Sequence, residues 1–391
     1  MPPTLYLLAL AVFAMGTSEF MLAGLLPAIA ADLGVPLGAA GMATSAFAVG
    51  MVVGAPLTAA FARRWPPRRG LPAFVLVFAV VHVAGALADH LWVLVVTRVA
   101  AAFAYAGFLA VALATAVTLV PAERTGRALA VLLSGTTLAT VAGVPGGAVL
   151  GGLLGWRVTF WAVAVLCLPA AVGIATAKTL RRPDAGSRAE RPAALALRAE
   201  IAQLARPRLL SAMTTAALVN AGTFGAFTFL APLITGPVGL SQRWIPVALM
   251  LFGLGSWLGV TAAGRLADRW PGQVVAVGGP LALLGWLATA ATTHPATLLV
   301  LVAVQGALSF AVGSTLVARV LGEATGAPTM GGAYATAALN LGAALGPIAA
   351  AATLGTGPAE RAPFVAAAVA VALALATASA TRVRAAVPVN R

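Results

Sequence analysis

The sequence predicts an all-α membrane protein with twelve transmembrane helices in two pseudo-symmetric six-helix bundles, and three observations lead to that prediction. First, the 391 residues are 61% hydrophobic and only 9% charged, whereas soluble domains are about 25% charged. Second, the apolar residues form runs that suit membrane helices and are too long for barrel strands. Third, the basic residues behind the net charge of +14 sit in short clusters between the runs, which argues against a face that binds nucleic acid.

The apolar runs define the expected helices, because a helix crosses the hydrocarbon core with about 20 apolar residues. The first six runs cover residues 4–30, 41–62, 71–88, 91–119, 128–153 and 158–177. Six more follow a polar stretch and cover residues 209–235, 245–263, 274–292, 296–318, 330–354 and 363–380. We therefore expect an N-terminal bundle in residues 1–177 and a C-terminal bundle with a short cytoplasmic tail in residues 209–391.

The polar stretch at residues 178–208 is expected to link the two bundles. It holds eight basic and three acidic residues and three prolines. Leu197, Ile201 and Leu204 can share one face of a short helix that lies on the membrane. A mobile linker without that helix fits the sequence equally well.

The basic residues predict the orientation of the helices. Twenty of the 24 lie after even-numbered runs, in the linker or near the C-terminus, three lie on the opposite side, and Arg98 lies within a run. Positive residues are retained on the cytoplasmic side of a membrane. We therefore expect both termini in the cytoplasm. We also expect a monomeric multi-pass protein of the inner (plasma) membrane that is surrounded by the lipid bilayer.

The two predicted bundles share a motif. The segment Gly54–Pro66 ends in Arg-Arg-Trp-Pro and aligns, 205 residues later, with Gly259–Pro271, which ends in Asp-Arg-Trp-Pro. Each copy closes the second helix of its bundle, which favours an internal duplication over a chance match.

The two six-helix halves, the basic linker and the segment Gly264-Arg-Leu-Ala-Asp-Arg269 resemble the major facilitator superfamily. The resemblance implies that Asp268 and Arg269 latch the halves together on the cytoplasmic side. The first copy departs from this pattern, because Arg63 stands where the second copy has Asp268. The alternative for these arginines is that they only set the topology.

The fifth run carries small residues at every fourth position, which places them on one helix face. They are Gly135, Ala139, Gly143, Gly147, Gly151 and Gly155. Such a face allows another helix to approach closely, and Pro145 removes one backbone donor and favours a bend. The segment Gly143-Val-Pro-Gly-Gly147 resembles the glycine-proline motif of antiporters in this superfamily, which implies a bendable interface between the halves; static packing is the alternative. The eleventh run repeats the face in part, with Ala338, Gly342, Gly346 and Ala350, and it contains Pro347.

Glu19 and Arg98 are the one acid and the one base inside the predicted spans. A charge at membrane depth costs several kcal/mol unless it is neutralised, paired or hydrated, so it marks a functional site. At 1.5 Å per residue both lie roughly 10–15 Å below the outer face. We predict that Glu19 carries a proton and that Arg98 tunes it; a permanent structural ion pair is the alternative.

The other mid-span polar residues are fewer than a site for a polar substrate would need. They include His82, Asn220, Gln305, Asn340, Thr44, Ser45 and Thr137, and aromatic surface is added by Tyr105, Phe108, Phe224 and Phe227. Such groups either face a substrate cavity or join neighbouring helices. From depth alone we select Tyr105, Asn220, Phe224 and Asn340 as substrate contacts, and we expect His82 to be packed and neutral. Tryptophans at run ends, where an interfacial belt is expected, are Trp65, Trp92, Trp156 and Trp244.

The sequence contains no sign of a nucleotide, cofactor or metal site. Lys178, the only lysine, follows an alanine, so there is no phosphate-binding Walker motif. No histidine or cysteine cluster is present, and Cys167 is expected to be a core residue. We therefore expect no enzymatic activity, no cofactor and no metal, and we expect transport to be driven by an ion gradient or by the substrate's own gradient.

Two further segments narrow the resemblance. Gly16-Thr-Ser-Glu-Phe20, which continues through Gly24-Leu-Leu-Pro27 to Asp32, is similar to the first helix of drug/proton and sugar-efflux antiporters, and Asn340–Gly346 is similar to their eleventh helix. The resemblance covers nearly the whole chain and is closest to the chloramphenicol-resistance exporters of high-GC Gram-positive bacteria. It implies proton-driven export of a small, largely apolar antibiotic by alternating access. The alternatives are a sugar or nucleoside exporter of the same fold, and a facilitator or membrane receptor without proton coupling.

Overall fold

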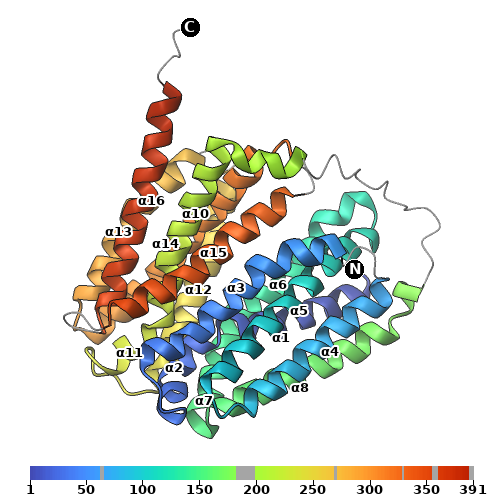
Figure 1. The fold of residues 1–391 in the computed structure, drawn as a ribbon, viewed down its shortest axis with the longest axis horizontal. Coiled ribbons are helices and arrows are strands. Elements are labelled where there is room, and N and C mark those ends of the chain that lie inside the picture. Colours follow the sequence, from blue (N-terminus) through green and yellow to red (C-terminus); the bar gives the residue numbers. More distant parts are fainter. Residues whose placement is uncertain (62–65, 182–198, 268–270, 328–329, 355–359, 387–391) are drawn as a thin grey trace. The chain divides into compact units, whose positions relative to one another are not determined.

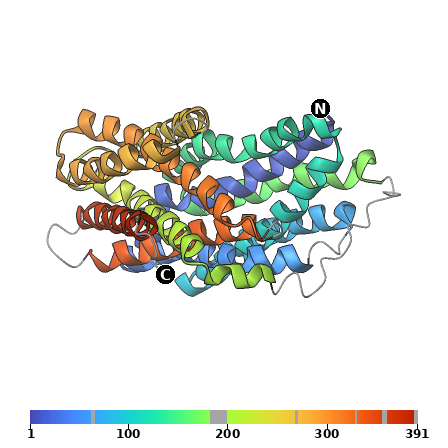
Figure 2. The same ribbon diagram turned by 90° about the horizontal axis from the view of Figure 1, so that it is seen from above.

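The computed structural model describes residues 1–61, 66–181, 199–267, 271–327, 330–354 and 360–386. In these ranges the chain forms helices and connecting turns, and no strand occurs among them (Figures 1 and 2). Twelve helices within the described ranges are long and apolar enough to cross a membrane. The predicted all-α class and the predicted number of spans are therefore confirmed.

The chain separates into two compact units. The first comprises Met1–Ala185 and Thr228–Gly253, and the second comprises Gly186–Phe227 and Leu254–Arg391. The predicted bundle boundaries at residues 177 and 209 stay a prediction. The helices that lie in or enter the first unit are α1 (Pro3–Phe20), α2 (Leu22–Asp32), α3 (Leu37–Phe61), α4 (Pro67–Ala86), α5 (Leu91–Thr118), α6 (Thr125–Leu138), α7 (Val144–Leu154), α8 (Trp156–Thr176), α11 (Leu230–Thr235) and the first part of α12 (Trp244–Ala267). Those of the second are α10 (Pro207–Thr228), the rest of α12, α13 (Pro271–Ala291), α14 (Pro295–Glu323), α15 (Gly331–Ala352) and α16 (Ala362–Ala386).

In the first unit, the helices that carry the candidate site pack directly on one another. α5 contacts α3 and α4, and α4 also lies along α8 (Figure 1). α1 packs against α6 and α8 and contacts α5. This packing brings residues from the first, third and fourth spans to one place.

The predicted first run, residues 4–30, is two helices rather than one. α1 ends at Phe20 and α2 begins at Leu22, with Met21 between them. Pro27, inside α2, has no backbone N–H and cannot donate to a carbonyl four residues earlier. The Ala23 carbonyl, just after the break, therefore lacks its helical donor.

The predicted seventh run, residues 209–235, is interrupted in the same way. α10 ends at Thr228 and α11 begins at Leu230. Pro232 cannot donate to the carbonyl of Thr228, so the interruption falls where that bond is missing. Pro232 lies 205 residues after Pro27, the same interval that separates the two Arg-Trp-Pro copies, so the prolines follow the internal repeat.

The fifth span, Arg127–Leu154, contains a π-helical turn at Ala139–Gly143. At its end the N–H of Val144 donates to the carbonyl of Ala139, five residues earlier. Pro145 follows directly and has no N–H to offer. The wider turn thus lies next to the proline at which the sequence predicted a bend, and π turns of this kind are common at functional sites.

The small-residue face of the fifth span packs against the first span. A Cβ added to Gly135, Gly143 or Gly151 would contact Ala9, Thr17 or Leu25, respectively. The partners advance by eight residues on both helices, so the two helices run in parallel along this face. The glycines therefore provide the close approach that their spacing predicted.

The eleventh span repeats this arrangement in the second unit. Added Cβ atoms on Gly342 and Gly346 of α15 would contact the carbonyls of Ala217 and Ala221 on α10. In each unit, then, a small-residue face on one long helix packs against the helix that an interruption follows. The shared packing supports the internal duplication independently of the Arg-Trp-Pro motif.

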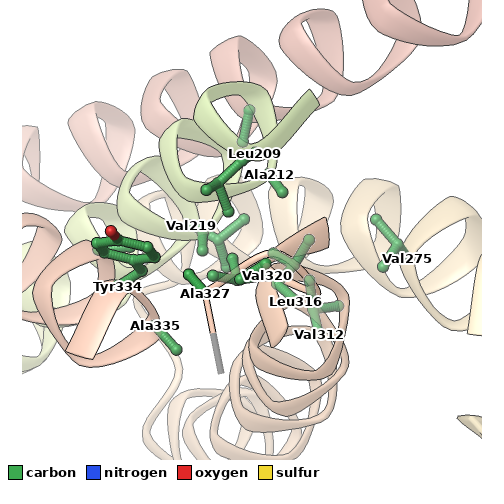
Figure 3. Packing of buried hydrophobic residues seen from close by; sticks show 14 residues of the cluster. Leu209, Ala212, Val219, Val275, Val312, Leu316, Val320, Ala327, Tyr334 and Ala335 are labelled. Carbon is green, nitrogen blue, oxygen red and sulfur yellow. The ribbon is translucent and has the colours of Figure 1, made fainter. Parts of the chain in front are cut away.

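The second unit has an apolar core to which the end of the linker is attached. Figure 3 shows this core, which is built from α10, α13, α14, α15 and α16 and includes Leu209, Ala212, Val219, Val275, Val312, Leu316, Val320, Ala327, Tyr334 and Ala335. Residues 199–202 are helical, and Leu204 packs against the core while Ile201 is exposed. Leu197 lies outside the described residues.

Glu200 holds the linker end to α15. Its carboxylate accepts a hydrogen bond from the N–H of Met330 at 2.9 Å, and its carbonyl accepts one from the Tyr334 hydroxyl at 2.7 Å. The Glu200 side chain is buried, with 5% of its surface exposed. A carboxylate at the N-terminus of a helix satisfies a free backbone donor and the helix dipole together.

The predicted tryptophan belt is only partly present. Trp92 and Trp244 are exposed at span ends, but Trp156 is buried. Its indole N–H donates to Asp32 at 3.1 Å and its ring packs edge-on against Phe160. Trp156 is therefore a packing residue, and Trp65 lies outside the described residues.

Candidate functional site

Arg98 lies at the interruption of the first span. Its side chain, on α5, has 1% of its surface exposed. Nη2 donates to the backbone carbonyl of Ser18 at 2.9 Å and approaches that of Glu19 at 3.5 Å. The last carbonyls of a helix lack helical partners, and the negative end of the helix dipole attracts a cation. Arg98 therefore caps the C-terminus of α1 from a neighbouring helix.

The Ser18 hydroxyl links Arg98 to His82. Nη1 of Arg98 donates to Ser18 Oγ at 2.6 Å, and Oγ lies 2.6 Å from Nε2 of His82. Nδ1 of His82 is 2.8 Å from the carbonyl of Phe78. A carbonyl only accepts, so Nδ1 carries a hydrogen, and in a neutral imidazole Nε2 then accepts the hydrogen bond from the Ser18 hydroxyl. The geometry of the chain Arg98–Ser18–His82–Phe78 is thus compatible with the neutral imidazole predicted for His82.

Aromatic rings enclose this hydrogen-bonded chain. The guanidinium carbon of Arg98 lies 4.4 Å from the centre of the Phe47 ring, within the range of a cation–π contact. His82 stacks on Phe78 at 4.2 Å. Tyr105, predicted as a substrate contact, is buried beside Phe47 and Phe78, with ring centres 6.2 and 6.4 Å away.

Glu19 lies in the last turn of α1, next to the residues that Arg98 contacts. The predicted common depth of Glu19 and Arg98 agrees with this placement, because the guanidinium reaches the backbone of Ser18 and Glu19. The Glu19 side chain is half-buried. Among the described residues, no hydrogen bond or ion pair reaches its carboxylate. The alternative of a permanent ion pair is therefore not what this structure contains, and Arg98 instead bonds to neutral groups.

Asn220 joins α10 to α15 in the second unit, and Asn340 bonds within α15. Nδ2 of Asn220 donates to the carbonyl of Leu339 at 2.7 Å, and Nδ2 of Asn340 donates to that of Thr336 at 3.0 Å. Phe224, one turn beyond Asn220, faces Phe227 with ring centres 6.4 Å apart. All three are half-buried. Three of the predicted substrate contacts thus belong to the second unit and Tyr105 to the first, and their shared role stays a prediction.

The residues of the predicted conformational motifs have different outcomes. Gly143 ends the π turn, Pro145 and Gly147 begin α7, and the Gly147 carbonyl accepts a hydrogen bond from Thr159 at 2.9 Å. Gly253 of α12, in the same unit, is so close that an added Cβ would lie 2.5 Å from the Thr140 carbonyl. Asp268 and Arg269, the predicted latch, lie outside the described residues.

A second ionic cluster lies at the other end of α2. Arg157 pairs with Asp32, lies 3.6 Å from Asp89, and donates to the carbonyl of Ala88 at 2.9 Å. The hydrogen bond from Arg157, with that from Trp156, holds the pKa of the Asp32 carboxyl below its ordinary value. The cluster ties the end of α2 to the start of α8 and to the loop before α5.

A pocket of about 910 Å³ opens at the ends of α10, α14 and α16. Its lining includes Arg206, Arg208, Ser211 and Glu323. None of the predicted substrate contacts lines it. Within the described ranges, no group of three or more His, Cys, Asp or Glu side chains could hold a metal ion.

Sequence reasoning missed Ser18 and Phe47 as partners of Arg98. Ser18 was visible only as the neighbour of Glu19, and serines in apolar helices usually bond within their own helix. Phe47 lies in the second span among many apolar residues, so no local pattern distinguished it. Both contacts depend on which helix faces Arg98, and that is a property of tertiary packing.

Comparison with known proteins gives matches over most of the chain. The sequence model of the Major Facilitator Superfamily matches residues 8–271. A chloramphenicol resistance protein of Streptomyces lividans is 64% identical over 356 residues, which cover 91% of this chain and 90% of that protein. The inner membrane transport protein YdhP of Escherichia coli K12 is 32% identical over 90% of this chain and 88% of its own length.

Solved structures with low sequence identity have the same fold. The nucleoside transporter NupG matches with a TM-score of 0.79 at 15% identity, and the match covers 96% of this chain and 98% of that one. A bacterial homologue of the human lysosomal transporter Spinster, in an inward-facing and unoccupied conformation, matches with a TM-score of 0.74 at 18% identity, covering 96% and 94%.

Proposed function

The chain belongs to the major facilitator superfamily, and from this premise we propose that it exports a small, largely apolar antibiotic, chloramphenicol, in exchange for protons. It is a multi-pass membrane transporter and not an enzyme. The observation that carries the choice of substrate is the 64% identity to a chloramphenicol resistance protein across nine-tenths of both chains. The scarcity of charge inside the spans also fits a neutral drug, which needs aromatic and hydrogen-bonding surface rather than an ion pair.

Glu19 is the proposed proton carrier. It is the one acid inside a predicted span, and its carboxylate has no bonded partner in the described part of the chain. A carboxyl at membrane depth without a partner is least costly when it holds its proton. The nearby guanidinium of Arg98 can stabilise the carboxylate after the proton leaves. Loading and release of one proton are thus both provided for at one position.

Transport is proposed to proceed by alternating access, with the drug contacting Tyr105, Asn220, Phe224 and Asn340. In this proposal Gly143, Pro145 and Gly147 allow the fifth span to bend, and Asp268 with Arg269 closes the cytoplasmic side. The protein works as a monomer in the inner (plasma) membrane with both termini in the cytoplasm. One proton that crosses about 150 mV supplies roughly 3.5 kcal/mol, enough for a drug gradient of about 300-fold.

The test uses everted membrane vesicles that carry Glu19→Gln. With an acidified lumen, vesicles with the unsubstituted protein accumulate labelled chloramphenicol, and added drug discharges the pH gradient. The variant is expected to lose both effects while it still equilibrates drug across the membrane, because a neutral amide cannot exchange a proton.

Asp32→Asn is the matched control, since it replaces an acid by its amide outside the spans. It should retain accumulation. Uphill accumulation by Glu19→Gln at the unsubstituted rate would refute the assignment of Glu19. The same assay is run with a labelled sugar and a labelled nucleoside. Transport of either in preference to chloramphenicol would refute the choice of substrate.

A further inference from the structure

His82 and Ser18 are buried polar residues that the proposed transport cycle does not yet use. Ser18 has 0% and His82 has 2% of its surface exposed. Both are fully hydrogen-bonded, and the last acceptor in their chain is a backbone carbonyl of α4. The chain is therefore anchored to a helix other than the one that carries Glu19.

One guanidinium nitrogen of Arg98 has no hydrogen-bond partner. Its two terminal nitrogens are occupied by Ser18 and by the backbone of Ser18 and Glu19, but its Nε is buried and has no partner. A buried donor without an acceptor costs about 1–3 kcal/mol. The Glu19 carboxyl, on the adjoining residue of α1, is the acidic group available to accept from this guanidinium.

We propose that Ser18, oriented by His82, is a neutral anchor for Arg98 that competes with the Glu19 carboxylate for the guanidinium. With Glu19 protonated, Arg98 rests on the Ser18 hydroxyl, as in this structure. When Glu19 loses its proton, the carboxylate draws the guanidinium away from Ser18. Ser18 and His82 are thus positioning residues that set the pH range over which Glu19 exchanges its proton.

Among the residues that the structure describes, few charged or titratable groups surround Arg98, which makes the competition simple. α1 contributes Glu19, α4 contributes His82, and α5 contributes Arg98 and Tyr105, whose ring packs on Phe47 and Phe78. A second cation near Arg98 would oppose the arrangement, and a neutral imidazole with its hydrogen on Nδ1 satisfies the His82 contacts to Phe78 and Ser18. The anchor therefore holds Arg98 without neutralising it.

The inference depends on the proposed proton exchange, and its test separates the two. Purified protein in weakly buffered detergent is titrated with chloramphenicol across a range of pH, and the protons released are measured. Ser18→Ala removes the anchor, so Arg98 holds the Glu19 carboxylate more tightly and the midpoint of proton release shifts to lower pH by about 1 unit.

Two further variants and a control sharpen the result. His82→Phe keeps the stacking on Phe78 but removes the acceptor of the Ser18 proton, and it should shift the midpoint in the same direction by less. The double variant should shift it no further than Ser18→Ala, because both residues act through one chain. Thr115→Val, which removes a buried hydroxyl bonded only to its own helix, should leave the midpoint unchanged.

Each outcome decides the matter. Proton release with an unshifted midpoint in both single variants, a shift to higher pH, or additive shifts in the double variant would overturn the anchor and leave the proposed function standing. If Ser18→Ala does not fold, His82→Phe alone decides by the same criterion. Absence of drug-induced release from the unsubstituted protein would overturn the proton exchange and the anchor together.

Discussion

At the scale of the residue, the charges at the two ends of α2 behave differently because their surroundings differ. Arg98 is enclosed by protein and bonds to a hydroxyl and to carbonyls. Arg157 is partly exposed and pairs with two carboxylates. A charge at membrane depth is costly and is usually retained for a function, so the enclosed position of Arg98 suits a functional role. The exposed cluster suits a structural role.

The Asp32 carboxylate is expected to make the stability of the protein depend on acid pH. Its folded pKa lies below the ordinary value of 3.8, so the stabilisation is complete above that value and is lost as the pH falls through the folded pKa. The melting temperature of the purified protein should exceed that of Asp32→Asn by a constant amount between about pH 7 and pH 5. The difference should shrink below about pH 4, and a difference that grows with acidification would contradict the role assigned to Asp32.

Sequence alone identified the charged residues of the candidate site but not their bonds. Glu19 and Arg98 were found because nothing else charged lies in the spans, and a common depth followed from counting residues. Glu19 and Ser18 are adjacent on α1, so a shift of one residue decides whether the Arg98 guanidinium bonds to the Glu19 carboxylate or to the Ser18 hydroxyl. That position depends on the interruption at Met21, which the composition of the run does not reveal.

At the scale of the element, the fifth span depends on glycines that leave no room for a side chain. Gly143→Ala would press a methyl group on the Thr17 side chain, which is fixed by a hydrogen bond to the Phe13 carbonyl at 2.7 Å. We expect a loss of about 1–3 kcal/mol of stability from overpacking. Thermal unfolding in detergent measures it.

Gly146 provides the matched control, because an added Cβ there meets nothing within 4 Å. Gly146→Ala should be neutral or slightly stabilising, since alanine favours helix over glycine. Equal destabilisation by both substitutions would mean that backbone freedom, rather than contact with Thr17, is what the glycines provide.

The end of the linker is expected to detach from α15 when its hydrogen bonds are removed. Tyr334→Phe removes the bond from the hydroxyl to the Glu200 carbonyl, and Glu200→Ala removes the acceptor of the Met330 N–H. Each should cost about 1 kcal/mol. Amide hydrogen exchange over residues 199–205 should accelerate in both variants.

Tyr6→Phe, which removes the hydroxyl of an exposed tyrosine, should leave this exchange unchanged.

The sequence left a membrane-lying helix and a mobile linker equally open, because three apolar residues fit either. At the described end of the linker, Leu204 packs against the apolar core of the second unit, a contact that exists only once that unit has folded.

At the scale of the whole molecule, the composition determined the class and the number of spans. A run of about 20 apolar residues crosses a bilayer as a helix. Twelve runs therefore predicted twelve spans, and the described residues form twelve helices long and apolar enough to cross a membrane. The interruptions at Met21 and Phe229 were missed because each run was taken as one helix from its length and overall composition. Only the positions of the prolines, 205 residues apart, carried a signal for them.

The predicted orientation can be tested with the single native cysteine as background. Cys167 is buried and has 0% of its surface exposed, so it should not react with a membrane-impermeant maleimide. Asp89→Cys, in an exposed loop, is expected to react in intact cells, because it lies on the side opposite the cytoplasm in the proposed topology. Glu123→Cys, also exposed, should react only after permeabilisation, and the reverse pattern would invert the topology.

The π turn also affects how the chain tolerates changes in its length. Such a turn contains one residue more than the α turn that it replaces. Deleting one residue within Ala139–Gly143 should therefore yield an ordinary helix whose flanking glycines still face the first span. The same deletion elsewhere in the helix would turn everything beyond it by about 100°. Loss of one codon here should therefore leave the fifth span in register with the first, while the π turn beside Pro145 is lost.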